Sequence, residues 1–194
     1  MGRQRPWREK TSAAILSPAA LDAWKAEGER FVVGVMGFSG AWRRSGLSGQ
    51  ALSDYVTDAE VAMSNALRRL HEAHGERLVM CSGATHIGVP GLAYTICQRE
   101  GITAAGITAA AAMRYRLGEM AVLTVVGRRF GDESAVFVAH CDAFLLLGGG
   151  PQSAHETRAA AAAGKPITVI QGFGGAADAF TAAELPTARF IPGR

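Results

Sequence analysis

An α/β protein with a doubly wound, mainly parallel sheet is the fold class that the sequence predicts. Short apolar runs alternate along the 194 residues with segments that have helical spacing of apolar residues. The apolar runs are continuous, which is typical of strands buried on both faces of a parallel sheet. Glycine-rich turns follow several of these runs. We therefore expect a Rossmann-like sheet flanked by helices on both faces.

The predicted elements begin after a basic segment. Residues 1–16 are expected to form a flexible arm, and residues 17–194 a single nucleotide-binding domain. The net charge is +3, but much of the excess lies in this arm, so the charge gives little reason to expect nucleic-acid binding, and none is predicted. A start rich in arginine and poor in acids is also typical of a transit peptide, and that alternative stays open.

The first half of the predicted domain contains two helices and a buried strand. Ser17-Pro18 is typical of a helix start, with serine at the N-cap and proline at the first helical position, and it predicts a helix over 19–29. An apolar strand follows over 31–36. The polar segment 41–49 predicts a loop, and helical spacing returns over 54–74.

The rest of the chain continues the alternation of strands and helices, with a proline where the next helix is expected to begin. The predicted elements are a strand over 78–81, a helix over 90–100, strands over 102–108 and 121–126, a helix over 133–140, a strand over 143–147, a helix over 153–163, a strand over 167–170 and a last helix that opens at 174–178.

Cysteine and histidine usage limits the functional classes. The three cysteines show no CxxC spacing and no even count, so reduced thiols in the cytoplasm are expected. His and Cys lack metal-ligand spacing, and we predict neither a metal nor a resident cofactor. No apolar run approaches the roughly 20 residues that a membrane span requires, so no membrane partner is expected.

Four predicted strands end in loops rich in glycine and hydroxyl side chains. Because the carboxyl ends of parallel strands meet at one edge of the sheet, these loops predict a pocket for a small phosphate-bearing ligand such as a nucleotide. The first loop does not match GxGxxG, so an NAD site is not expected. The candidate binding residues are Gly37, Ser39, Gly40, Ser82, Gly83, Thr85, His86, Gly148, Gly149, Gly150, Gln152, Ser153, Gly174 and Gly175.

The segment 145–156 is the most informative of these. An apolar strand runs into three glycines, and a helix then opens with Ser153 and Glu156. Backbone amides at a helix N-terminus suit a phosphate, and the glycines let a ligand approach closely. The spacing Ser-x-x-Glu is also that of a capping box, an alternative that the residues leave open.

Gly148-Gly-Gly-Pro-Gln-Ser-Ala-His-Glu156 resembles the PGGxGTxxE signature of the LOG (Lonely Guy, or lysine decarboxylase-like) family, within the SLOG superfamily of Rossmann-like proteins. The strand over 142–147 and Gly164-Lys-Pro166 match as well, and the likeness covers residues 31–184. The resemblance implies that the signature binds a nucleotide phosphate. It implies cleavage of the base–ribose bond of nucleoside 5′-monophosphates with Glu156 acting at the ribose, and a homodimer.

Two departures from the signature bear on catalysis. Gln152 stands where the signature has glycine, and Glu133 falls near the position of an arginine that the hydrolases of the family carry. Arg128 is the candidate replacement for that arginine. Glu156, Glu133 and Arg128 are therefore the catalytic candidates, although Glu133 is also explained as an acid at a helix N-terminus. The alternative function is a non-catalytic nucleotide sensor, or a binding protein that resembles molybdenum-cofactor carriers.

Overall fold

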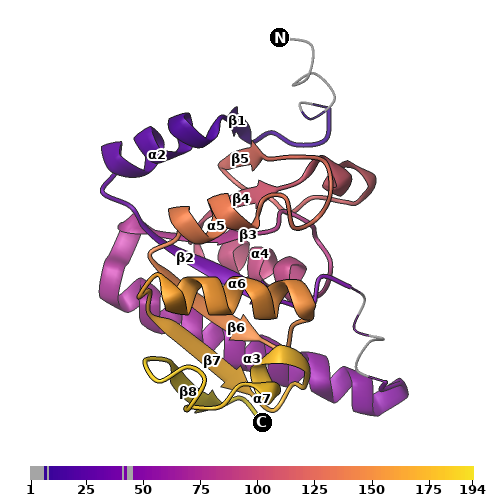
Figure 1. Ribbon diagram of the computed structural model, residues 1–194. Coiled ribbons are helices and arrows are strands. Elements are labelled where there is room, and N and C mark those ends of the chain that lie inside the picture. Colours follow the sequence, from indigo (N-terminus) through magenta and orange to yellow (C-terminus); the bar gives the residue numbers. More distant parts are fainter. Residues whose placement is uncertain (1–6, 8, 41, 43–45) are drawn as a thin grey trace.

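Eight parallel strands form one sheet in the order β1-β5-β4-β3-β2-β6-β7-β8 (Figure 1). The computed structural model describes residues 7, 9–40, 42 and 46–194. The expected α/β fold with a parallel sheet is confirmed. The strands are β1 (Ala14–Leu16), β2 (Phe31–Gly37), β3 (Leu78–Ser82), β4 (Thr103–Thr108), β5 (Val122–Val125), β6 (Ala143–Leu147), β7 (Ile167–Gln171) and β8 (Arg189–Pro192).

Helices cover both faces of the sheet, as expected (Figure 1). The long α3 and α4 pack on one face, and α2, α5, α6 and α7 pack on the other. The helices are α2 (Pro18–Glu27), α3 (Gly49–His74), α4 (Gly88–Glu100), α5 (Ser134–His140), α6 (Pro151–Ala162) and α7 (Gly175–Ala179), with short 3-10 helices η2 (Gly75–Arg77) and η3 (Ala110–Arg114).

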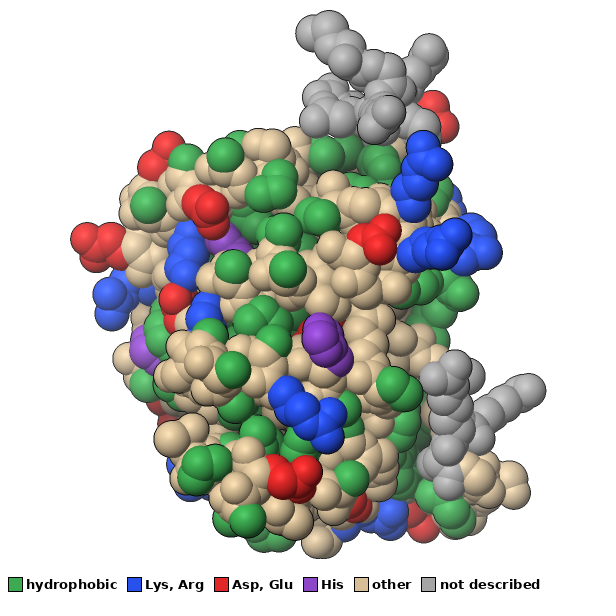
Figure 2. All heavy atoms as spheres, viewed as in Figure 1, with side chains coloured by type: hydrophobic (Ala, Val, Ile, Leu, Met, Phe, Trp, Pro, Cys, Tyr) green, Lys and Arg blue, Asp and Glu red, His purple; other side chains and the backbone are tan. Residues whose placement is uncertain are grey.

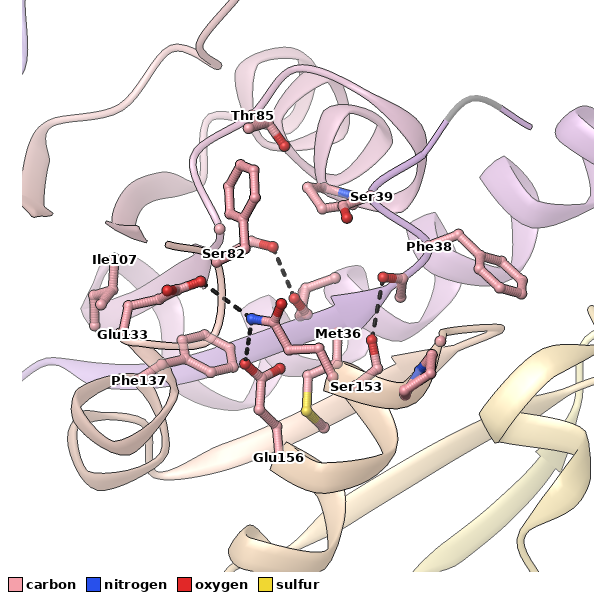
Figure 3. A pocket seen from close by; sticks show the side chains of 18 residues that line it. Met36, Phe38, Ser39, Ser82, Thr85, Ile107, Glu133, Phe137, Ser153 and Glu156 are labelled. Atoms are coloured by element: carbon pink, nitrogen blue, oxygen red, sulfur yellow. Dashed lines mark hydrogen bonds between the residues drawn. The ribbon is translucent and has the colours of Figure 1, made fainter. Parts of the chain in front are cut away.

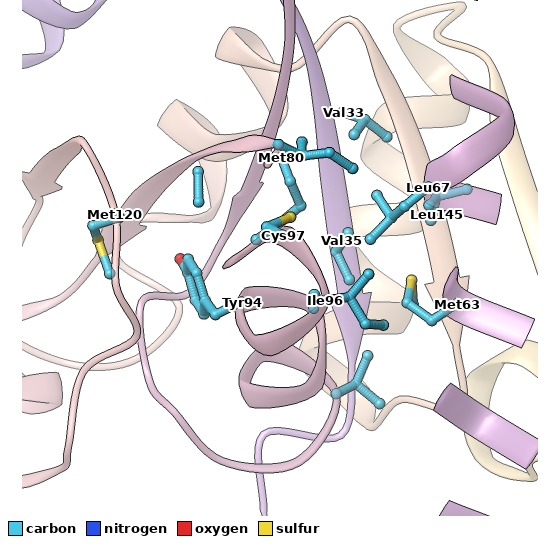
Figure 4. Close-up of a cluster of buried hydrophobic side chains, with 14 of the residues drawn as sticks. Val33, Val35, Met63, Leu67, Met80, Tyr94, Ile96, Cys97, Met120 and Leu145 are labelled. Atoms are coloured by element: carbon cyan, nitrogen blue, oxygen red, sulfur yellow. The ribbon is translucent and has the colours of Figure 1, made fainter. Parts of the chain in front are cut away.

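The core consists of two apolar clusters, one on each side of the sheet. Successive residues of a strand point to opposite faces, so Val33 and Val35 pack toward α3 and α4 while Val32 and Met36 pack toward α5 and α6. Figure 4 shows the first cluster, where side chains of α3 and α4 meet those of β2, β3 and β6. Burial on both faces explains the continuous apolar runs of the sequence.

The strand order reverses direction at β2, and this reversal positions the site. The chain proceeds from β2 through β3 and β4 to β5 on one side, then returns to place β6 on the other side of β2. Gly37, at the end of β2, lies opposite Leu147, at the end of β6. A crevice opens at the carboxyl ends of strands where the order of an open α/β sheet reverses, and ligands bind there.

The two edge strands were not predicted. β1 pairs with β5, so the prediction of a flexible arm through residue 16 is wrong for its last three residues. Trp7 is also buried in the core. Residues 1–6 and 8, which include three of the basic residues of the predicted arm, lie outside the described residues. Both edge strands are short, and three or four residues give no apolar run that periodicity detects.

The helix α3 begins earlier than predicted, at Gly49 rather than Asp54. Its first turn is mostly exposed, and Gln50 donates a hydrogen bond to Asp54 on the outer surface (2.7 Å). Apolar periodicity marks only the packed part of a helix, so it missed this turn. Of the predicted loop over 41–49, residues 41 and 43–45 lie outside the described residues.

On the face drawn in Figure 2, which looks onto α5 and α6 as Figure 1 does, Lys and Arg side chains are interspersed with acidic ones. Within the described residues, no helix combines the length and the apolar character needed to cross a bilayer. The same residues contain no group of three or more His, Cys, Asp or Glu placed to hold a metal ion.

Candidate functional site

A cavity of about 180 Å³ lies at the reversal point, where β2, β3 and β4 end and α6 begins (Figure 3). Its wall combines backbone from the glycine loops, hydroxyl side chains and two carboxyl groups. The structure brings together most of the predicted site residues here. Those that line the cavity are Gly37, Ser39, Ser82, Gly83, Thr85, Glu133, Gly150, Gln152, Ser153 and Glu156.

Four of the predicted glycines do not line the cavity and instead hold two neighbouring loops together. The Gly148 carbonyl accepts a hydrogen bond from the Ala177 amide (2.8 Å), and the Gly149 carbonyl accepts one from the Ala176 amide (2.9 Å), both in α7. Gly174 and Gly175 form the turn into α7 with positive φ angles of 73° and 63°. A Cβ atom on Gly175 would lie 2.3 Å from the Gly149 oxygen. These glycines therefore allow the β6 and β7 loops to pack against each other.

The remaining candidates, Gly40, His86 and Arg128, also lie outside the cavity wall. The backbone amide of His86 donates to the carbonyl of Arg116 (2.8 Å), and burial together with the nearby Arg116 lowers the pKa of the His86 ring. Arg128 lies in an exposed loop, where its backbone amide donates to Asp132 (2.7 Å). Among the described residues that line the cavity, none carries a positive charge.

The helix α6 presents its N-terminus to the cavity. It begins at Pro151 with Gly150 at the N-cap, two residues before the predicted start, so the capping-box interpretation is wrong. Ser153 lies inside the first turn, and its hydroxyl donates to the Gly37 carbonyl (3.2 Å). The backbone amides of Gln152 and Ser153 have no partner within the helix because of their position in the first turn. Such amides attract an anion.

Two buried carboxyl groups share one amide at the other side of the cavity (Figure 3). The side-chain nitrogen of Gln152 donates to Glu133 Oε1 (3.1 Å) and to Glu156 Oε1 (3.0 Å). The Ser134 hydroxyl also donates to Glu156 Oε1 (2.6 Å), and the Gly131 amide donates to Glu133 Oε2 (2.9 Å). We call Glu133, Ser134, Gln152 and Glu156 the carboxylate cluster.

Burial raises the pKa of both carboxyl groups of the cluster. The hydrogen bonds from Gln152 and Ser134 act in the opposite direction because they stabilise the ionised form. Asp132, the neighbour of Glu133, behaves differently. It is exposed, and the backbone amides of Arg129 and Arg128 lower its pKa. Asp132 therefore stabilises the loop that carries Arg128, and Glu133 is the acid that belongs to the site.

An aromatic side chain that sequence reasoning missed completes the wall. Phe130 lines the cavity with 43% of its surface exposed, and its ring packs at a tilt against the Tyr115 ring (centroids 6.0 Å apart). The one sign of this role in the sequence was the occurrence of a phenylalanine inside a polar, glycine-flanked loop. Phe173, the aromatic residue of the glycine-rich turn after β7, does not line the cavity, because it is buried in the core and packs edge-on against Tyr55.

The loop after β3 is held in a strained conformation beside the cavity. Ala84 lies between two lining residues, is fully buried and has a φ of 65°, a region that residues with a side chain seldom adopt. The buried Tyr94 hydroxyl accepts a hydrogen bond from the Ala84 amide (3.2 Å) and donates to the Ala105 carbonyl (2.9 Å). Tyr94 is thus a positioning residue for the hydroxyl and glycine groups of this loop.

Replacement of Tyr94 by phenylalanine is expected to lower the free energy of unfolding by about 1 to 3 kcal/mol, because the Ala84 amide and the Ala105 carbonyl lose a buried partner. Urea denaturation measures the difference. Tyr115→Phe is the matched control, since Tyr115 is partly exposed, and it should leave the stability unchanged. Equal stability of the Tyr94→Phe variant and the wild type would contradict this role.

Comparison with known proteins supports the fold assignment. No family model and no curated protein matches the chain. Among solved structures, TM1055 superposes with a TM-score of 0.60 at 21% identity, over 84% of this chain and 91% of that one. The molybdenum cofactor carrier protein of Chlamydomonas reinhardtii gives 0.56 at 19% identity, and the molybdenum cofactor binding protein of Rippkaea orientalis 0.61 at 15%, each over 84% of this chain and 89% of its own. These likenesses are likenesses of fold.

Proposed function

We propose that the protein binds a phosphate-bearing small molecule, a nucleotide or a pterin-type cofactor, and holds it without cleaving it. The observation that carries this proposal is the place of Gln152. Its side-chain amide lies between Glu133 and Glu156 and occupies an oxygen atom of each. An open glycine is expected at this position of a LOG-type hydrolase signature.

In this proposal the phosphate group of the ligand binds at the N-terminus of α6. The amides of Gln152 and Ser153 are unpaired within the helix, and Gly150 and Gly37 leave the backbone accessible from the cavity. A helix N-terminus carries a partial positive charge, which stabilises an anion where no cationic side chain is at hand. The hydroxyl groups of Ser39 and Thr85 line the same cavity and supply further polar contacts.

Two features argue against turnover. Cleavage of a base–ribose bond needs a carboxylate free to stabilise positive charge at the ribose and a base free to activate water. In the carboxylate cluster, the hydrogen bonds from Ser134 and Gln152 stabilise the ionised form of Glu156, which makes this carboxylate a weaker base. Glu133 falls near the position of the arginine that the hydrolase pattern carries, and Arg128 lies in an exposed loop and does not line the cavity.

Binding without turnover also agrees with the kind of protein that shares the fold. Two of the solved neighbours are named as a carrier and a binding protein for the molybdenum cofactor. We propose that this chain is a divergent relative of the LOG and SLOG proteins that has a carrier or sensor role. A cytoplasmic location and a homodimer remain part of this proposal, the latter testable by light scattering.

The second candidate is a nucleoside monophosphate hydrolase, and one observation favours it. Burial raises the pKa of Glu133 and of Glu156, and two neighbouring carboxyl groups with raised pKa values are suited to acid and base catalysis near neutral pH. In this alternative Glu156 acts at the ribose and Glu133 holds or accepts the proton. Gln152 then has to move away when substrate binds.

A paired assay separates the two functions. Thermal denaturation is recorded with a panel of nucleoside 5′-monophosphates and pterins, and release of free base is followed on the same samples. A binder is expected to be stabilised by about 2.7 kcal/mol when the ligand is present at 100 times its Kd, with no base released. Base release that disappears in the Glu156→Ala variant would establish the hydrolase instead. Absence of any shift across the panel would reject the binding proposal.

A further inference from the structure

We propose that Glu133 and Glu156 bind the amino-bearing edge of a planar heterocycle, the 2-amino-4-oxopyrimidine edge shared by guanine and pterins, with the ring against Phe130. This inference rests on the proposed function, because it assigns the part of the ligand that lies beyond the phosphate. It follows from three properties of the cavity wall: its hydrogen-bonding capacity, its charge and its aromatic rim.

The carboxylate cluster has more acceptors than donors. Its donors are all engaged: the two N–H groups of Gln152 point to the two carboxyl groups, and the Ser134 hydroxyl points to Glu156. An ionised carboxylate offers about four acceptor sites and no donor. A ligand group that meets this cluster therefore has to supply N–H or O–H donors.

One oxygen atom of Glu156 is available for that purpose. Glu156 Oε1 accepts from Ser134 and Gln152, while Oε2 accepts no hydrogen bond from the described residues. Oε2 keeps some contact with solvent, although the Glu156 side chain as a whole is buried. Glu156 lines the cavity and its Oε1 is held by Ser134 and Gln152, so we assign Oε2 to the ligand.

The charge of the wall restricts the ligand in the same way. Both ionisable side chains among the described lining residues are acids, Glu133 and Glu156. A second phosphate or a carboxylate of the ligand would be repelled at this end of the cavity, whereas neutral N–H donors gain charge-assisted hydrogen bonds. The phosphate of the ligand is thus expected at the α6 N-terminus, and its N–H donors are expected at the carboxylate cluster.

The aromatic rim favours a flat ring over a sugar as the donor. Phe130, Phe137 and Ile107 line the cavity next to Glu133, and Phe130 exposes 43% of its surface. A partly exposed aromatic ring gains from stacking on a planar group. For a purine or pteridine ring lying on Phe130, the edge points along the plane of the ring, so that the amino group reaches Oε2 of Glu156 and the adjacent ring N–H is directed to the neighbouring Glu133.

The matched ligands GMP and IMP test this assignment, because they differ only in the 2-amino group. Calorimetry is expected to give a Kd for GMP about 10 to 100 times lower than for IMP, the effect of one hydrogen bond to a charged group. Pterin and lumazine form a second pair, in which an oxo group replaces the amino group, and they show whether the ring is a purine or a pteridine.

Two variants locate the effect. In Glu156→Gln the Ser134 hydroxyl and the Gln152 amide hold the carbonyl oxygen at the Oε1 position, so the new amide nitrogen faces the ligand amino group and the preference for GMP over IMP is expected to vanish. In Phe130→Leu both ligands are expected to weaken equally, with the ratio of their Kd values kept. Thermal denaturation confirms that each variant is folded.

The outcomes separate this inference from the proposed function. Binding of GMP, IMP and AMP with equal Kd values, and of pterin and lumazine with equal values, would leave the phosphate-binding function standing and overturn the edge assignment. A preference that persists in Glu156→Gln would also overturn it. If no member of either pair binds, the edge assignment is rejected, and the full panel of nucleoside 5′-monophosphates in the thermal denaturation assay decides the proposed function separately.

Discussion

The Gln152→Glu variant is expected to lose about 1 to 3 kcal/mol of stability at pH 8, because two buried carboxyl groups lose the amide that they share, while remaining close to the wild type near pH 4.5. The substitution adds a third carboxyl group to Glu133 and Glu156 and removes the amide that they share. Glu133 and Glu156 are buried and residue 152 is exposed, so the added charge acts on the two buried carboxyl groups by repulsion and is not itself buried. Urea denaturation at a series of pH values between 4 and 8 measures the effect.

The sign of the pH dependence follows from the raised pKa values of the buried acids. Below the pKa of the unfolded chain the carboxyl groups are protonated in both states, and the stability is fully present. As the pH rises toward the folded-state pKa, the folded state retains protons that the unfolded state has released, and stability is lost. Gln152→Met, which removes the amide without adding charge, is expected to show a smaller loss. A penalty for Gln152→Glu that does not change with pH would contradict this account.

The Gly175→Ala variant is expected to lose about 3 kcal/mol or more and to bind ligand weakly. Its Cβ atom would lie 2.3 Å from the Gly149 oxygen, a backbone atom that cannot move alone. The residue also has a φ of 63°, which disfavours any side chain. The loop before α6 has to shift, and the unpaired amides of Gln152 and Ser153 shift with it. Chemical denaturation and ligand calorimetry measure the two effects.

Gly164→Ala is the matched control for this prediction. Gly164 has a similar φ of 70°, but no atom lies within 4 Å of a Cβ placed on it. It therefore carries the conformational cost of about 1 to 2 kcal/mol without the collision, and it lies at the far end of α6 from the cavity. Equal losses in the two variants would mean that loop packing at Gly149 contributes nothing.

The central part of the fold was predictable from the sequence because burial on both faces leaves a continuous apolar run. The predicted strands over 31–36, 78–81 and 143–147 agree with β2, β3 and β6 to within a residue. The edge strands β1 and β8 were missed because an edge strand is short and only partly buried. The same reason explains why the first, exposed turn of α3 was missed.

The position of the site was predictable, but its internal contacts were not. Glycine and hydroxyl residues at strand ends indicated one edge of the sheet, and the cavity lies there. Which glycines face the ligand depends on how the loops pack, so Gly148 and Gly175 were assigned to the ligand although they serve the packing of α7. Gln152 and Glu156 are an i, i+4 pair on α6, whereas the hydrogen bond from Gln152 to Glu133, the N-cap of α5, joins two distant segments that no local pattern connects.

A single-turnover experiment tests the central claim most directly, that the pocket holds its ligand intact. Protein in excess is mixed with base-labelled GMP, or with a labelled pterin phosphate, and bound and free label are separated and identified after one hour. We predict that label remains with the protein and is recovered as the unchanged ligand, and that Gly175→Ala retains little of it. Recovery of the label as free base from the wild type, with Glu156→Ala preventing its release, would contradict the claim.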